Sequence, residues 1–359
     1  MAVSTTDPEA RMSANDSTQM SALAQASSAA HPVPDRGHVN NYREDTELQQ
    51  LLALYLPADL YAHLQPYFER MGELAGGAVD DWALEADRNP PTLEMRSRSG
   101  KEVQRIVKHP AYVEMEKVAY QQFGLAAISH REDMLGWKGK MPAIVKYALT
   151  YLFVQSEFGL CCPLSMTDSL TRTLKKYGEQ KLVDKYLPTL LAMDFDSAVQ
   201  GSMFMTEQAA GSDISNTLTM AYPQEDGNWR LYGEKWFCSN PDAGFGMVLA
   251  RVEGGPPGMK GISLFLLPRT LDDGSTNHYT IVRLKDKMGT RSMASGEIRM
   301  DGAVAYLVGE QGRGFVQIAD MVNNSRLSNG MRAAGMMRRA VAEAEFIARE
   351  RWAFKHRLQ

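Results

Sequence analysis

The spacing of apolar residues changes twice along this chain, and the two changes divide it into parts. From 45 to 196 apolar residues recur every three or four positions, as in Leu48, Leu51 and Leu52, which predicts amphipathic helices. From 197 to 308 the period shifts toward two, and glycine-rich turns separate runs such as 262–267, which predicts strands. Helical spacing returns from 309 to 359. The pattern therefore predicts an α+β multidomain protein, with an N-terminal all-α bundle, a middle β-barrel or sandwich, and the start of a C-terminal α-helical bundle.

The chain outside these periodic segments is treated as a tail, and its most apolar window as core. Residues 1–44 are rich in Ser, Ala, Asp and Pro and lack the cationic start of a secretory signal, so we expect a disordered tail. The window 143–164 carries Lys146, Gln155 and Glu157, which would be costly in hydrocarbon. It is predicted to be a buried core helix, and no membrane span is expected.

Charge and cysteine content exclude some classes of function. Lys plus Arg is 39 against 43 for Asp plus Glu, so the whole chain has no cationic field for nucleic acid or an anionic membrane. Cys161, Cys162 and Cys238 cannot form a disulfide framework, which favours the reducing cytoplasm. Cys and His show no metal-ligand spacing, so no metal is predicted.

A polar corner at 203–213 is the strongest candidate site. The stretch starts as an apolar strand and turns into small and hydroxylated residues. Gly211 would let the main chain approach a ligand closely, while Thr206 and Ser212 supply hydroxyl groups. Trp236 downstream could supply an aromatic wall. The residues alone leave two interpretations open, a ligand-binding turn or an ordinary hairpin corner.

These two pieces resemble the flavin-binding signature of the acyl-CoA dehydrogenase family. In that family a Thr-Glu-Pro-Gly-Ala-Gly-Ser-Asp turn is followed, after a fixed gap, by Trp-Ile-Thr-Asn. Here the turn reads Thr-Glu-Gln-Ala-Ala-Gly-Ser-Asp and the second piece reads Trp-Phe-Cys-Ser, with the gap kept. The resemblance implies a homo-oligomer (a dimer of dimers) that carries FAD. It places the FAD contacts at Met205, Thr206, Gly211, Ser212, Trp236, Cys238, Ser239, Arg351 and Phe354.

The resemblance also assigns roles to these contacts. Thr206 matches the residue at the pyrimidine end of the flavin, Ser212 the residue that reaches the pyrophosphate, and Trp236 the ring beside the isoalloxazine. Cys238 stands where the family has a threonine that meets flavin N5, and it is a weaker donor, so Ser239 is its possible substitute. Arg351 and Phe354 match residues that help to hold the flavin of a neighbouring subunit. A solvated helix charge is the alternative for Arg351.

The activity implied is oxidation of an acyl-CoA thioester to its 2,3-enoyl product, a step of fatty acid metabolism. A carboxylate removes the α-proton while the flavin accepts the β-hydride. Arg326 matches an arginine that positions the substrate, but its predecessor is Ser325, which cannot act as the base, and the counterpart of Glu207 serves the turn. The base is therefore expected beyond Gln359, in the missing part of the C-terminal bundle, or this member is not a working dehydrogenase. A truncated product that binds flavin poorly is a third possibility.

Several stretches resemble the alkylation-response (AidB-type) branch of the family: 88–91, 109–112, 162–167, 236–237 and 283–289. That branch carries flavin, has weak or unassigned dehydrogenase activity, and binds DNA through its C-terminal domain. The final stretch here has a positive balance from seven basic residues: Arg332, Arg338, Arg339, Arg349, Arg351, Lys355 and Arg357. DNA binding is therefore kept as an alternative to a solvated helix face, which such charge clusters usually are.

Overall fold

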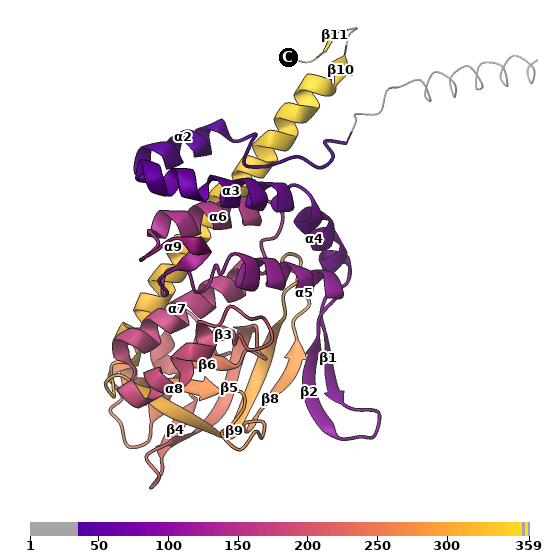
Figure 1. Cartoon of the computed structure of the whole chain (residues 1–359). Coiled ribbons are helices and arrows are strands. Elements are labelled where there is room, and N and C mark those ends of the chain that lie inside the picture. The colour runs from indigo at the N-terminus through magenta and orange to yellow at the C-terminus, as the bar shows by residue number, and fades with distance from the viewer. Residues whose placement is uncertain (1–34, 354–355, 358–359) are drawn as a thin grey trace, which may run out of the picture. The chain divides into compact units, whose positions relative to one another are not determined.

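The computed structural model describes residues 35–353 and 356–357 (Figure 1). These residues fall into two compact units. One, the main unit, is His38–Arg339, and the other contains the described residues of 1–37 and 340–359. Both corners of the candidate site belong to the main unit. Most of the predicted tail, 1–34, lies outside the described residues.

The first half of the main unit is mainly helical. Its elements are α2 (Thr46–Tyr55), α3 (Ala58–Ala75), α4 (Ala78–Arg88), α5 (Pro110–Glu116), η2 (Lys117–Gln122), η3 (Met134–Gly136), α6 (Ala143–Val154), α7 (Cys161–Tyr177) and α8 (Gln180–Leu190). Pro110 lies in the first turn of α5, where a missing N–H costs nothing. Leu64, Phe68 and Leu149 are fully buried in one hydrophobic cluster, which confirms the helical bundle.

Three local predictions in this half are wrong. The segment predicted to be all-helical contains an antiparallel hairpin, β1 (Thr92–Arg96) with β2 (Glu102–Val107). The window 143–164 is two helices, because the Glu157 carboxylate accepts the Leu160 N–H at 2.9 Å as α7 begins. The predicted tail ends earlier than residue 44, since Tyr42 is 2% exposed and stacks on Phe68.

The second half of the main unit is a β-barrel. Its strands are β3 (Gly201–Phe204), β4 (Met220–Pro223), β5 (Trp229–Ser239), β6 (Phe245–Val252), β7 (Ile262–Pro268), β8 (Tyr279–Leu284) and β9 (Ser295–Val308), with the short turns η4 (Ile214–Asn216) and η5 (Gly258–Gly261). The pairing order β6-β4-β5-β9-β7 closes because β7 also pairs with β6. Strand β3 extends the sheet beside β6, and β8 pairs with β9.

The position of strand β6 explains why its sequence is apolar without alternation. Val248 and Ala250 lie in the barrel interior, whereas Met247 and Leu249 pack outward against residues of α7 and α8. The same two helices cover this face of the barrel in Figure 1. A strand buried on both faces reads as a continuous hydrophobic run.

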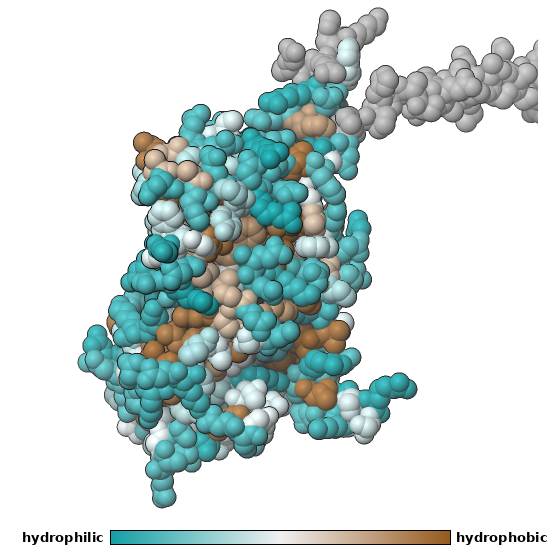
Figure 2. Space-filling model, viewed as in Figure 1, coloured by the Kyte–Doolittle hydropathy of each residue, from teal (hydrophilic) through white to brown (hydrophobic). Residues whose placement is uncertain are grey.

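One long helix, α9 (Gly314–Glu350), follows the barrel. Its first turns are buried at Ile318 and Met321, and Gly335 lies against Tyr151 and Val154 of α6. After it, the short strands β10 (Trp352–Ala353) and β11 (His356–Arg357) pair with each other. In the part of the chain that the structure describes, no helix has both the length and the apolarity needed to cross a membrane. The face drawn in Figure 2 is mostly hydrophilic, with scattered apolar patches.

Candidate functional site

The two predicted corners meet in the structure. The chain leaves β3 at Phe204 and runs on through Met205 and Thr206. The main-chain N–H of Trp236 donates to the carbonyl of Thr206 at 2.7 Å, and Lys235 Nζ donates to the carbonyl of Met205 at 3.3 Å. Residues thirty positions apart in the sequence are thus held side by side. The side chains of both Thr206 and Trp236 are half-buried.

A buried ion pair holds this junction between the two corners in place. Lys235 Nζ lies 2.6 Å from Glu207 Oε1, and the two side chains are 0% and 6% exposed. Glu207 also accepts from the Thr219 hydroxyl at 2.6 Å and the Leu218 N–H at 2.7 Å. Burial raises the pKa of Glu207, but the charge and hydrogen bond of Lys235 outweigh it, so the net shift is downward. The Glu207 carboxyl group therefore stays ionised and is a poor proton acceptor.

Sequence reasoning missed this pair, although a signal was present. Trp229, Leu231 and Gly233 occupy alternate positions of β5, and Lys235 is the next residue in this alternation, on the same face of the strand. A lysine at an inward position of a strand needs an anionic partner nearby. Glu207, in the opposite corner, was the available carboxylate.

The turn after Thr206 is held by its own hydrogen bonds. Glu207 and Ala210 exchange main-chain bonds at 3.0 and 3.2 Å. Gly211 and Ser212 are exposed, and a Cβ built at Gly211 would meet no atom within 4 Å. Asp213 then caps η4 by accepting the Ser215 N–H at 3.0 Å. Among the described residues, the hydroxyls of Thr206 and Ser212 have no hydrogen-bond partner.

The Trp236 ring lies under two cations that the sequence did not point to. Lys285 Nζ is 3.5 Å from the ring centroid and the Arg283 guanidinium 5.6 Å, close enough for cation–π attraction. Glu297 pairs with both cations. A β-bulge between Lys235 and Cys238 breaks the alternation of β5 here, and Phe237, at φ 53°, projects outward with 63% exposure.

Cys238 and Ser239 follow Trp236 on β5 and differ in how deeply they are buried. Cys238 is 0% exposed within the barrel core, and burial raises the pKa of its thiol to about 12. Ser239 is half-buried, and its carbonyl accepts the Ser202 hydroxyl at 2.6 Å. The structure therefore brings the main chain of Ser239 to β3, while the Cys238 thiol packs inside the barrel.

The remaining predicted residues are Arg326, Arg351 and Phe354. Arg326 is exposed on α9, where it donates to Asn323 Oδ1 at 3.3 Å. Arg351 is exposed and belongs to the other unit, where its N–H bonds to the Ile347 carbonyl at 2.8 Å. Phe354 lies outside the described residues. Within the main unit, no described contact joins Arg326 to the two corners.

A buried charged network joins α6, α7 and α9. The carboxylate of Asp168 bonds to His130 Nε2 at 2.8 Å, Lys146 Nζ at 3.0 Å and Asn324 Nδ2 at 2.7 Å. Burial raises the pKa of Asp168, yet these partners together lower it to about 2. A cavity of only 20 Å³ lies beside it, and the Ser165 hydroxyl that lines this cavity has no partner. The bundle thus contains a polar seam that helical periodicity did not reveal.

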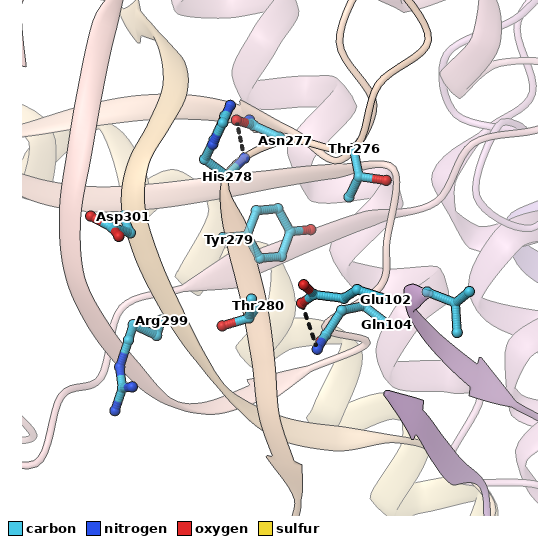
Figure 3. A pocket seen from close by; sticks show the side chains of 10 residues that line it. Glu102, Gln104, Thr276, Asn277, His278, Tyr279, Thr280, Arg299 and Asp301 are labelled. Carbon is cyan, nitrogen blue, oxygen red and sulfur yellow. Dashed lines mark hydrogen bonds between the residues drawn. The ribbon is translucent and has the colours of Figure 1, made fainter. Parts of the chain in front are cut away.

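The cavity shown in Figure 3 lies away from the corners. It measures 440 Å³, between Thr280, Arg299 and Asp301 of β8 and β9 and Glu102 and Gln104 of β2. The Gln104 side chain accepts the N–H of a β8 residue, Ile281, at 2.8 Å, which docks the hairpin on the barrel. This cavity is a junction between two substructures, and none of the predicted site residues lines it.

The basic stretch of α9 is largely used within the fold. Arg332 is 4% exposed and stacks on Phe158 at 4.9 Å. Arg338 pairs with Asp45 at 3.3 Å, and Arg339 pairs with Asp80 at 3.1 Å. Arg338 and Arg339, which are paired with carboxylates, contribute little to a field that would attract nucleic acid.

Comparison with known proteins identifies both halves of the main unit. Residues 32–197 match the model of the adaptive response protein AidB N-terminal domain, and residues 202–303 match the acyl-CoA dehydrogenase middle domain. Acyl-CoA dehydrogenase family member 11 of Caenorhabditis elegans is 30% identical over 88% of this chain and 52% of its own length. The putative acyl-CoA dehydrogenase AidB of Escherichia coli is 33% identical over 75% of this chain and 49% of its own.

Solved structures show the same fold. The apo form of Bd2924 is 34% identical with a TM-score of 0.83, over 90% of this chain and 64% of that one. Caenorhabditis elegans ACDH-11 in complex with C11-CoA is 28% identical with a TM-score of 0.82, over 91% and 56%. The chain spans about half the length of the curated relatives that it matches.

Proposed function

Because this chain belongs to the acyl-CoA dehydrogenase family and shares the N-terminal domain of its AidB-type members, we propose that it binds FAD and takes part in α,β-dehydrogenation of an acyl-CoA thioester. The observation that carries the proposal is the hydrogen bond from the Trp236 N–H to the Thr206 carbonyl. It places a half-buried indole beside a turn of free hydroxyls, and a flat polar ring needs both a stacking surface and hydrogen-bond partners.

The residues of the two corners fit a flavin. Thr206 and Ser212 have hydroxyls without partners among the described residues, and the Gly211 position leaves its surface open to close approach. These residues would hold the FAD, with Trp236 against the ring and Ser239 beside it. The bound cofactor would supply the acceptor for the β-hydride. Since the Cys238 thiol is sealed in the barrel, we assign Cys238 to packing beneath the corner.

The corners orient and hold but do not supply the base. Glu207 is tied to Lys235, Thr219 and Leu218, and the lowered pKa of its carboxyl makes it a weak proton acceptor. Arg326, preceded by Ser325, has no adjacent carboxylate and would position the substrate. We therefore propose that the described corners hold the cofactor and that a carboxylate outside them removes the α-proton.

We propose an acyl-CoA as the substrate class; its support is that a relative with the same fold was solved in complex with C11-CoA. A homo-oligomer, as a dimer of dimers, is proposed on the same family likeness. No described contact favours the DNA-binding alternative, since Arg332, Arg338 and Arg339 are committed within the fold.

The decisive experiment is anaerobic addition of a series of acyl-CoA thioesters to the purified, FAD-loaded protein. Bleaching of the flavin absorbance by at least one chain length is expected. A flavin that stays oxidised with every thioester, together with salt-dependent binding of duplex DNA, would overturn the proposal. Protein that stays colourless with added FAD would refute the assignment of the corners.

A further inference from the structure

A separate cavity of 200 Å³ lies next to Trp236. Lys285 connects the two, because it lines this cavity and also sits over the indole ring at 3.5 Å. The walls come from the loop after α4, the loop after β8 and the start of β9: Pro90, Pro91, 284–287, Arg291 and 293–295. The two prolines offer no N–H to a ligand, so hydrogen-bond donors come from the other side of the cavity.

That other side is rich in cations. Lys285, Lys287 and Arg291 line the cavity, and Arg283 lies just before them on β8. Glu297 is shared by Arg283 and Lys285 and neutralises only one of the two. Asp286 is the one carboxylate in the lining, and it is exposed to solvent. The lining therefore keeps an excess of positive charge.

Lys287 is the informative member of this group. Its ammonium donates to the Met293 carbonyl at 2.6 Å and the Ser295 hydroxyl at 3.2 Å, both neutral oxygens. Among the described residues, no carboxylate lies within ion-pair distance of it. Burial is the largest effect on Lys287 and lowers the pKa of its amine. Lys287 is half-buried, and the Glu157 carboxylate acts on it only from beyond ion-pair distance, so a closer anion is left for a ligand to supply.

Arg291 completes the arrangement. It is exposed, and within the residues that the structure describes it has neither an acidic partner nor a hydrogen bond. Its guanidinium offers a planar fork of donors, while Lys287 offers a compact point charge held in place by Met293 and Ser295. A fork and a point charge on the same cavity are donors that suit a tetrahedral oxyanion.

We propose that this cavity binds a small phosphate-type anion, either inorganic phosphate or a terminal phosphate of a larger ligand, held by Lys287 and Arg291. The proposal does not depend on the flavin or on the dehydrogenation. The cavity is too small for a whole dinucleotide, but one phosphate group fits the 200 Å³ beside Lys285.

The test is calorimetric titration of the protein with inorganic phosphate at low ionic strength. We expect saturable binding that is weakened about tenfold or more by Lys287→Met, because a hydrogen-bonded charge is lost. Arg291→Gln should weaken binding several-fold, and because this side chain is exposed the change leaves the fold intact. Lys101→Met makes the same charge change at an exposed turn that does not line the cavity, and it should bind phosphate like the unchanged protein.

Two results would overturn the proposal. One is the absence of saturable phosphate binding by the unchanged protein, and the other is equal binding by the Lys287→Met and Lys101→Met variants. Competition with coenzyme A and with FAD distinguishes the sources of the anion. Displacement of phosphate by either compound assigns the site to the phosphate of that ligand, and undisturbed binding assigns it to a free anion; both results support an anion site.

Discussion

The buried pair of Lys235 and Glu207 gives the sharpest quantitative prediction, because it joins both corners of the site. Lys235→Met removes the ammonium and leaves the Glu207 carboxylate buried with only the Thr219 and Leu218 donors. Glu207→Gln leaves the ammonium without its anion. Since breaking a buried pair by removing one partner costs about 3–5 kcal/mol, each single change should lower the free energy of unfolding by this amount.

The double variant separates the pair from other effects. With both charges removed, no uncompensated charge is left in the double variant. Its loss of unfolding free energy should therefore be smaller than the sum of the losses of the two single variants by about 2 kcal/mol or more. The assay is urea unfolding followed by circular dichroism for the four proteins of the cycle. Flavin content of the same proteins adds a functional readout, because Lys235 also bonds to the Met205 carbonyl beside Thr206.

An exposed pair between β5 and its neighbour β9 is the matched control. Glu234 and Arg299 are 2.7 Å apart but 55% and 61% exposed, so the cycle Glu234→Gln with Arg299→Met should give a coupling below about 1 kcal/mol. Equal couplings in the two cycles, or additive losses at Lys235 and Glu207, would refute the burial argument.

Three further predictions concern other parts of the main unit. The pKa of Asp168 is about 2 in the folded protein and 3.8 in the unfolded chain, so ionised Asp168 adds about 2 kcal/mol to the free energy of unfolding. This stabilisation is present above about pH 4 and is lost as the pH falls toward 2. Asp168→Asn should abolish this pH dependence, which urea unfolding measures. Gly330→Ala on α9 meets no atom and should raise the free energy of unfolding by about 0.5–1 kcal/mol, whereas Gly335→Ala, 2.4 Å from a valine methyl, should lower it by about 1–3 kcal/mol; melting temperatures measure both. The thiols of Cys161 and Cys238, buried and with raised pKa values, should react with an aromatic disulfide reagent only as the protein unfolds, and rapid reaction in the native state would contradict their placement.

Periodicity was sufficient for the order of elements because it reports burial on one face. Residues 46–88 form the helices α2, α3 and α4, and the run 262–267 lies within a buried strand. Periodicity could not find the hairpin Thr92–Val107, because both strands are short and only Gln104 and Ile106 of β2 are buried. Nor could it divide 143–164, since apolar residues continue from α6 into the first turn of α7.

The candidate site was predictable in part for a similar reason. A turn rich in hydroxyls and a tryptophan are local features, so Thr206, Ser212 and Trp236 could be selected from sequence. The cations above Trp236 come from β8 and the loop that follows it, and only the pairing of β8 and β5 with β9 brings them together. The inward thiol of Cys238 follows from a bulge, which shifts the parity of every residue after it.

Flavin affinity of Trp236→Ala tests the central claim most directly, with Tyr232→Ala as its control on the same strand. We expect loss of the indole to weaken FAD binding about fivefold or more, since one aromatic contact contributes about 1 kcal/mol beyond its buried area. Tyr232 is 43% exposed and packs on Tyr222, so its loss should leave FAD affinity unchanged. Equal affinity of both variants for FAD, measured by fluorescence titration of folded protein, would show that the two corners do not hold the flavin ring.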